Sequence, residues 1–197
     1  INLKPVDIHE VLEEIVFLLG PQGASCSVKI ELECPSAPPK VLGDPAQLRQ
    51  VFLNLGTNAI QAMPQGGKLT IGVSERADGP GEVGRRYVAI SFRDTGCGIP
   101  PENMGKVFSP FFTTKSEGIG LGLAVSHGII ENHNGIITVE SEVGKGSNFT
   151  VWLPVPTLPG PQGSASLDAT RPGVAESRDF SRGEVQALPS RDVEKGA

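Results

Sequence analysis

Apolar residues recur at helical spacing in two stretches of the chain, residues 6–20 and 43–63. In the first stretch Asp7 is available as an N-cap, and the apolar positions are Val6, Ile8, Val11, Leu12, Ile15, Leu18 and Leu19. In the second stretch the stripe consists of Leu48, Val51, Phe52, Leu55, Ala59 and Ala62. Asp44 can cap this helix, Pro45 suits its first position, and Gln47 can close a capping box. We therefore predict two amphipathic helices.

Alternating apolar and polar residues predict strands over 27–34, 68–75, 85–94, 135–142 and 147–154. The connections read as a hairpin loop at 77–84, a loop with one helical turn at 99–117, and a glycine turn at 143–146. A third helix is predicted over 120–133, and Asn134–Gly135 ends it in the left-handed region. This pattern indicates an α+β two-layer sandwich, with helices on one face of a mixed, largely antiparallel sheet.

The apolar pattern stops near residue 157. Residues 158–197 are rich in Pro, Gly, Ser and mixed charge, with Phe180 as their one aromatic residue. Such a segment buries too little apolar surface to offset its ordering entropy. We therefore predict a folded domain over 1–157 and a disordered tail over 158–197. Because the chain begins with Ile1, we expect it to be a fragment or a processed product.

Composition excludes several classes of protein. The net charge is −5 without clustered Lys and Arg, which argues against nucleic-acid binding. No apolar run reaches the length of a membrane span, so we expect no membrane contact from this segment. Three widely spaced cysteines fit a reducing, cytoplasmic location and form no metal-ligand pattern. We expect the three histidines, His9, His127 and His133, to occupy helix surfaces or caps.

The polar motifs carry the chemistry. Asn54 and Asn58 lie one helical turn apart, and amide oxygens can bind Mg²⁺, although such a pair can also be a solvated helix flank. Asp94 ends a strand in a DxGxG turn, where it can accept a hydrogen bond from adenine N6 or simply form the turn. The glycine run at 118–124 precedes a helix, and this combination can hold phosphates without a basic patch. The chain has no P-loop, and GxGxG is not a dinucleotide fingerprint.

Five motifs occur in one order: NLGTNA at 54–59, DTGCGIP at 94–100, FSPFFTTK at 108–115, GIGLGLA at 118–124 and GKGS at 144–147. This series resembles the N, G1, F, G2 and G3 boxes of the ATP-binding domain of sensor histidine kinases. The resemblance covers almost all of residues 1–157 and implies the Bergerat fold. The PFFTTK form is similar to kinases of the nitrogen-regulation type.

The resemblance also implies roles for individual residues. Asn58 would coordinate Mg²⁺, and Asn54 would support the metal–phosphate end. Asp94 would recognise adenine, and Lys115 would approach the γ-phosphate, so that Asn54 and Lys115 are the expected catalytic residues. Three phenylalanines, Phe108, Phe111 and Phe112, would anchor the ATP lid. The remaining expected nucleotide contacts are Gly96, Gly98, Ile99, Thr113, Thr114, Gly118, Gly120, Leu121, Gly122 and Leu123.

The function implied by the resemblance is that of the catalytic half of a histidine kinase. It would bind ATP, ADP and Mg²⁺ and donate the γ-phosphate to a histidine on a separate dimerisation domain, which in turn supplies a response regulator. None of the three histidines lies in an HE-x-x-x-P-type acceptor helix, so the fragment is not expected to autophosphorylate.

Three alternatives stay open on the sequence. ATPases of the same fold, as in gyrase B, MutL and heat-shock chaperones, carry a general-base glutamate where this chain has Asn54, and an amide cannot accept that proton. The second alternative is a protein-serine kinase of the anti-sigma type, and the third is a nucleotide-sensing module without catalysis.

Overall fold

The computed structural model describes residues 1–35, 40–77, 79–81, 84–115 and 118–156. The elements in chain order are β1 Lys4–Val6, α1 Ile8–Ser25, β2 Val28–Glu33, β3 Val41–Gly43, α2 Pro45–Gln61, β4 Gly67–Arg76, β5 Tyr87–Asp94, α3 Pro101–Met104, α4 Gly122–Asn132, β6 Ile136–Glu142 and β7 Gly146–Pro154. The predicted tail, 158–197, lies outside the described residues, as do parts of the predicted loops 77–84 and 99–117.

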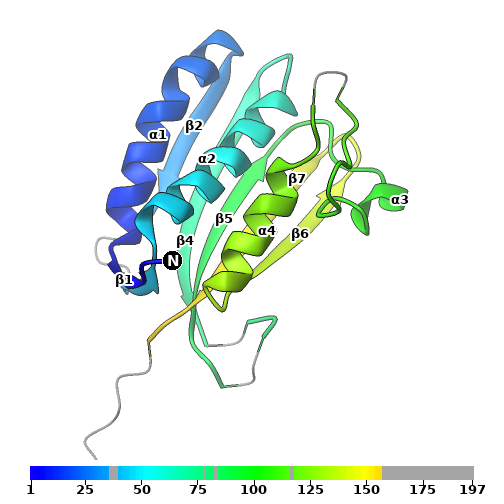
Figure 1. Cartoon of the computed structure of the whole chain (residues 1–197). Helices are drawn as coiled ribbons and strands as arrows, with labels where there is room; N and C mark the ends of the chain where they lie inside the picture. The colour runs from blue at the N-terminus through cyan, green and yellow to red at the C-terminus, as the bar shows by residue number, and fades with distance from the viewer. Residues whose placement is uncertain (36–39, 78, 82–83, 116–117, 157–197) are drawn as a thin grey trace, which may run out of the picture. The chain divides into compact units, whose positions relative to one another are not determined.

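The main sheet has five strands in the order β2-β4-β5-β7-β6. The β2–β4 pair is parallel, and the other three pairs are antiparallel. Helices α1, α2 and α4 lie side by side on one face of this sheet (Figure 1). The predicted fold class is therefore confirmed. Strand β5 is the central strand of this sheet, and Asp94 is its last residue.

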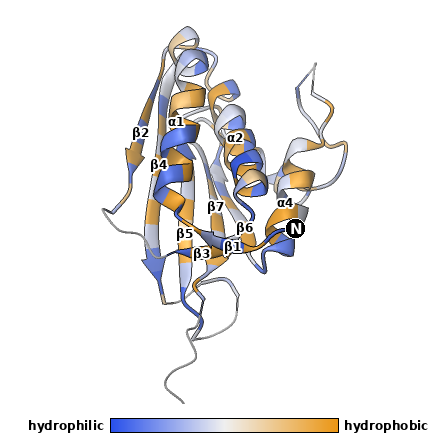
Figure 2. Ribbon diagram, turned by 60° about the vertical axis from the view of Figure 1, so that its left-hand side comes forward, coloured by the Kyte–Doolittle hydropathy of each residue, from blue (hydrophilic) through white to orange (hydrophobic). Residues whose placement is uncertain are grey.

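The core lies between the helices and the sheet. Buried side chains of α1 and α2 meet alternate residues of β4, β5 and β7 in one hydrophobic cluster. Phe52 of α2 stacks on Phe92 of β5 with ring centroids 5.9 Å apart. The outer helix surfaces are mixed, with hydrophilic stretches on α1 and α2 (Figure 2). Among the described residues, no helix combines the length and apolar character needed to cross a bilayer.

The N-terminus of α2 corrects one prediction. The Asp44 carboxylate caps the helix as expected, accepting from Ala46 N at 3.0 Å and Gln47 N at 3.4 Å. The capping box predicted for Gln47 is wrong, because Asp44 N donates to His133 Nε2 at 2.9 Å. The Gln47 Oε1 atom is buried without a recorded partner among the described residues. His133 is the C-cap of α4, but it is buried, with only 2% of its surface exposed.

Helix α1 also differs from the prediction. It continues through Pro21 to Ser25, although proline removes one backbone donor and usually ends a helix. The carbonyl that loses its donor belongs to Phe17, a residue that is 80% exposed. Leu18, predicted in the apolar stripe, is 46% exposed. The small sheet formed by β1 and β3 was not predicted.

Candidate functional site

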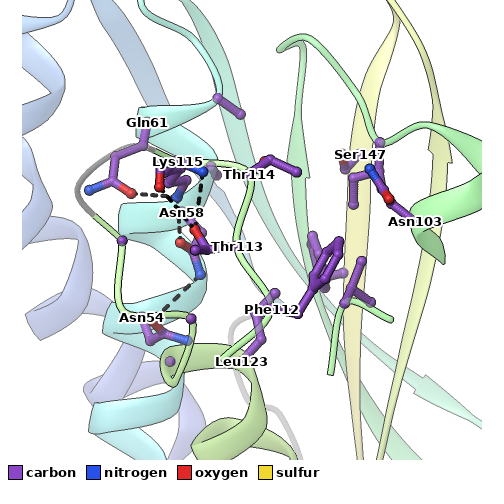
Figure 3. Close-up of a pocket in the computed structure, with 18 of the residues that line it drawn as sticks. Asn54, Asn58, Gln61, Asn103, Phe112, Thr113, Thr114, Lys115, Leu123 and Ser147 are labelled. Atoms are coloured by element: carbon purple, nitrogen blue, oxygen red, sulfur yellow. Dashed lines mark hydrogen bonds between the residues drawn. The ribbon is translucent and has the colours of Figure 1, made fainter. Parts of the chain in front are cut away.

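A cavity of about 720 Å³ lies at the C-terminal ends of α2 and β5. Its walls come from α2, the Asp94–Pro100 turn, the loop that follows α3, the glycine run before α4 and the start of β7. The labelled side chains Asn58 and Gln61 of α2 meet Lys115 of the neighbouring loop at one end of it (Figure 3). The volume is in the range of cavities that hold a cofactor-sized ligand.

Asp94 forms one end of the cavity. Its side chain is 4% exposed, and Oδ1 accepts from Gly96 N at 2.8 Å and from Ser147 N at 3.1 Å. Burial raises the pKa of the carboxyl above its ordinary value, against the lowering effect of these two N–H groups. Among the described residues no donor is recorded for Oδ2. One carboxylate oxygen is thus fixed by the backbone, and the other is available to a ligand.

The two asparagines of α2 are held from α4. Asn54 Nδ2 donates to Ser126 Oγ at 2.9 Å, and Ser126 is 2% exposed. Asn58 Nδ2 makes a long hydrogen bond of 3.5 Å to Asn54 Oδ1. The Asn58 oxygen therefore faces the cavity. Figure 3 shows the two amides stacked along α2.

Lys115 reaches α2 from the loop before Gly118. Its Nζ donates to Asn58 Oδ1 at 2.8 Å and makes a short contact with Gln61 Oε1 (Figure 3). Burial lowers the pKa of the ammonium, and the nearby Cys97 thiol opposes this shift. The loop is held by Lys115 N, which donates to Thr113 Oγ1 at 3.1 Å. Two neutral amide oxygens therefore hold a cation at this end of the cavity.

The glycine run turns the chain into α4. Gly120 has φ 72°, and a Cβ there would lie 2.5 Å from the Phe111 carbonyl carbon, so only glycine fits. Gly122 opens α4, and a Cβ there would lie 2.3 Å from Asn54 Oδ1. The N-terminus of α4 therefore lies directly against the asparagine face of α2, where its partial positive charge favours an anion.

Most of the predicted contacts come together. Those that line the cavity are Asn54, Asn58, Asp94, Gly98, Ile99, Thr113, Thr114, Lys115, Gly118, Gly120, Leu121, Gly122 and Leu123. Gly96, Phe108 and Phe111 do not line it. Gly96 packs against the end of α2, where a Cβ would lie 2.5 Å from Ala62 O.

The three phenylalanines differ from one another. Phe108 packs edge-on against Phe149 and lies 5.2 Å, between ring centroids, from His127, so it anchors the loop in the core. Phe112 lines the cavity. Phe111 is 73% exposed, so its ring does not anchor the loop; its backbone has a φ of 65°, and its N–H donates to Gly120 O at 2.9 Å.

Several lining residues were not predicted as contacts. They include Gln61, Cys97, Asn103, Val107, Ser147 and Phe149. Ser126 lies behind Asn54 and was missed as well. The spacing of Gln61, three residues after Asn58 on the same helix, could have indicated it. Ser147 contributes only a backbone N–H to Asp94, for which the side-chain pattern gives no signal.

The sandwich fold, with a buried carboxylate at one end of its cavity and a glycine-bent helix start at the other, defines a nucleotide-binding domain. Comparison with known proteins makes this specific. Residues 43–157 match the family described as histidine kinase-, DNA gyrase B-, and HSP90-like ATPase. The chain belongs to this family.

The curated relatives of the chain include a sensor histidine kinase and a sporulation kinase. The chain is 41% identical over 162 residues to the sensor histidine kinase ZraS of Escherichia coli (strain K12), a match that covers 82% of this chain and 33% of ZraS. It is 37% identical over 148 residues to sporulation kinase E of Bacillus subtilis, covering 75% of this chain and 19% of that kinase. The chain therefore spans about a third or less of the length of these relatives.

Solved structures give the same assignment. The catalytic domain of the histidine kinase ThkA matches with a TM-score of 0.67 and 30% identity, over 79% of this chain and 99% of that domain. Full-length ShkA, solved in complex with AMPPNP, matches with a TM-score of 0.68 and 30% identity, over 80% of this chain and 32% of ShkA. Within the family, the chain thus belongs with the histidine kinase catalytic domains.

Proposed function

We propose that this domain binds Mg·ATP and donates the γ-phosphate to a histidine on a separate dimerisation domain of its parent kinase. One observation carries the proposal. Asp94 and Lys115 line the same cavity, and among the described residues neither has an ionic partner. A ligand with an amine donor at one end and an anion at the other complements both. Adenine N6 and the triphosphate of ATP are such a pair.

The adenine end is assigned to Asp94. Its free oxygen accepts from an exocyclic amine, whereas guanine presents an acceptor oxygen at the corresponding position. Ile99 and the Gly98 backbone form the adjacent wall. Recognition therefore rests on one charge-assisted hydrogen bond to a buried carboxylate at this end of the cavity.

The residues at the other end suit a metal ion. The amide oxygen of Asn58 already accepts a hydrogen bond from the Lys115 ammonium group, so it can accept a cation. Asn58 Oδ1 is the proposed Mg²⁺ ligand, with phosphate oxygens and water completing the coordination. When bound, the ion neutralises charge on the phosphates. The α4 N-terminus and Lys115 would orient the phosphate oxygens.

Asn54 favours transfer of the γ-phosphate over hydrolysis of ATP. Its amide donates to Ser126 and accepts from Asn58, and it has no group that takes a proton from water near neutral pH. A general base is therefore missing at this position. The domain is expected to preserve the γ-phosphate until an acceptor histidine arrives.

No described histidine is suited to be that acceptor. His133 is buried with both ring nitrogens engaged, by Asp44 N and by Ile129 O. His9 and His127 are partly exposed beside Glu13 and Glu131, but neither lies in an HE-x-x-x-P-type acceptor helix. The acceptor is therefore proposed on a separate domain. The ThkA structure solved with the response regulator TrrA shows that histidine kinase with such a partner, and we propose a response regulator as the downstream partner here.

The test combines binding and transfer. Calorimetry should show Mg²⁺-dependent binding of ATP and ADP, which Asn58→Ala abolishes and the control Asn132→Ala on α4 leaves intact. Mixed with a histidine-bearing helical hairpin of the parent kinase, the domain should form an acid-labile phosphohistidine, and alone it should not label itself. Rapid ATP hydrolysis without an acceptor would instead establish the ATPase alternative.

A further inference from the structure

Lys115 is held in an unusual way for a lysine of this protein. The described lysines with recorded ion pairs, Lys29, Lys68 and Lys145, each contact a glutamate. Lys115 contacts two neutral amides instead, Asn58 and Gln61. A carboxylate partner would neutralise the ammonium in every state of the domain. Neutral amides hold it more weakly, so an incoming anion can take it away.

The end of α2 provides the rest of this arrangement. Gln61 is the last residue of α2, three residues after Asn58, so both amides project from the same face at the C-terminus of the helix. The C-terminus carries the negative end of the helix dipole. The ammonium is therefore held by two amide oxygens and by the helix end together.

We propose that Gln61 is a positioning residue of the nucleotide site: with Asn58 it holds the Lys115 ammonium in the place of the metal while the site is empty. The inference rests on the proposed function, in which Asn58 Oδ1 binds Mg²⁺. The ion and the ammonium would lie within a few ångströms of each other on the same oxygen, and two cations repel at that distance. Binding of Mg·nucleotide therefore requires Lys115 to leave Asn58 and Gln61.

The proposal predicts how the affinity for Mg·nucleotide changes when Gln61 is replaced. Gln61 stabilises only the empty state, so its removal makes the binding of Mg·nucleotide more favourable. Gln61→Met keeps the length of the side chain and deletes the acceptor. We expect the Kd for Mg·ADP to fall by about fivefold, the size of one charge-assisted contact that is partly open to solvent. The Kd for Mg·ATP should fall by the same factor, because Gln61 contacts neither bound nucleotide.

A double-mutant cycle with Lys115→Met separates this role from a structural one. In the Lys115→Met background, Gln61→Met should leave the Kd for Mg·ADP unchanged, because the group that Gln61 holds is gone. Gln50→Met, at an exposed position of the same helix, is the matched control and should have no effect in either background. A second readout is the rate at which the Lys115 amine is acylated in the empty domain. It should rise in Gln61→Met relative to the exposed Lys106 of the same protein.

The outcomes are distinguishable. Absence of Mg²⁺-dependent ADP binding in the wild type would refute the proposed function itself. Wild-type binding together with a Gln61→Met effect that persists undiminished in the Lys115→Met background would show a structural role and overturn the inference. An unchanged or increased Kd in Gln61→Met, with unchanged acylation of Lys115, would overturn it as well.

Discussion

Asp94→Asn should stabilise the empty domain while it weakens adenine binding. The substitution keeps an oxygen for Gly96 N and Ser147 N and replaces only the free oxygen by NH₂. The carboxylate is 4% exposed and has no cationic partner among the described residues, so its charge is buried at a cost. The amide removes that cost. It also presents a donor where adenine N6 needs an acceptor.

The expected magnitudes follow from these contacts. Loss of one charge-assisted hydrogen bond costs ~1.5–3 kcal/mol, which raises the Kd for ADP about tenfold to 150-fold. The two N–H groups already offset part of the burial cost, so we expect a gain of about 1 kcal/mol in unfolding free energy. For a domain of this size that corresponds to about 2–4 °C in Tm.

The stability gain should depend on pH. Burial raises the pKa of Asp94 in the folded state, so the folded state binds the proton more tightly than the unfolded state. The destabilising effect of the charge is therefore present at neutral pH. It disappears as the pH falls through the raised pKa toward the ordinary value of 3.8. The difference in Tm between Asp94→Asn and wild type should shrink over the same interval.

Asp44→Asn is a control for which we expect a change in Tm of the opposite sign. The Asn2 backbone N–H, followed by those of Gln47 and Ala46, lowers the pKa of Asp44, so its charge stabilises the folded state above the ordinary pKa. That variant should lose Tm at pH 7 and recover as the pH falls. Calorimetric scans between about pH 7 and pH 3, which extend below the ordinary pKa of both carboxyls, with ADP and GDP titrations at pH 7, test both predictions. A lower Tm for Asp94→Asn at pH 7, or equal ADP and GDP affinities in the wild type, would refute the reasoning.

Three further predictions concern other parts of the chain. His133→Leu leaves the part-buried Asp44 N without its acceptor, so the free energy of unfolding, measured with urea, should fall by about 1 kcal/mol; an unchanged urea midpoint would contradict this. Asn54→Glu places a carboxylate near the phosphates and should give slow ATP hydrolysis where the wild type shows negligible turnover; a phosphate-release assay without any gain would show that the geometry is not shared with the hydrolytic relatives. Removal of residues 158–197 should change neither Tm nor ADP affinity; a large fall in Tm would show that this segment docks on the domain.

The sequence predicts those structural elements that are determined by interactions between residues close together in the chain. The apolar stripe of α2, its cap at Asp44 and the strand that ends at Asp94 were all evident from spacing and capping chemistry. Strands β1 and β3 were not, because three residues are too few to show alternation. Leu18 was misassigned because periodicity marks an apolar face but does not show where the neighbouring helix stops covering it.

The missed parts of the site depend on contacts between distant segments. Gln47 satisfies the sequence rule for a capping box, yet His133, 89 residues beyond Asp44, takes the backbone donor. Ser126 becomes relevant only because α4 packs on α2 and brings its hydroxyl to Asn54. From the sequence, Gln61 at the end of its helix would be taken for a solvent-exposed residue. Its role depends on the contact with Lys115, which lies 54 residues later in the chain. Local rules identify candidates, and tertiary packing decides which partner each one takes.

The polar side chains that α2 presents to the cavity are neutral amides, whereas Mg²⁺ in proteins is commonly bound by carboxylates. Asn54, Asn58 and Gln61 present amides, and no cluster of three or more His, Cys, Asp or Glu among the described residues could hold a metal ion. Carboxylates here would bind Mg²⁺ more tightly in the absence of nucleotide, would pair permanently with Lys115, and at position 54 would activate water. Amides avoid all three consequences, because they coordinate weakly, release a lysine to a phosphate and accept no proton near neutral pH. In the proposed site a metal ion would then depend on the nucleotide phosphates for most of its ligands. Its binding would be tied to the presence of ATP or ADP, and the γ-phosphate would remain available for transfer.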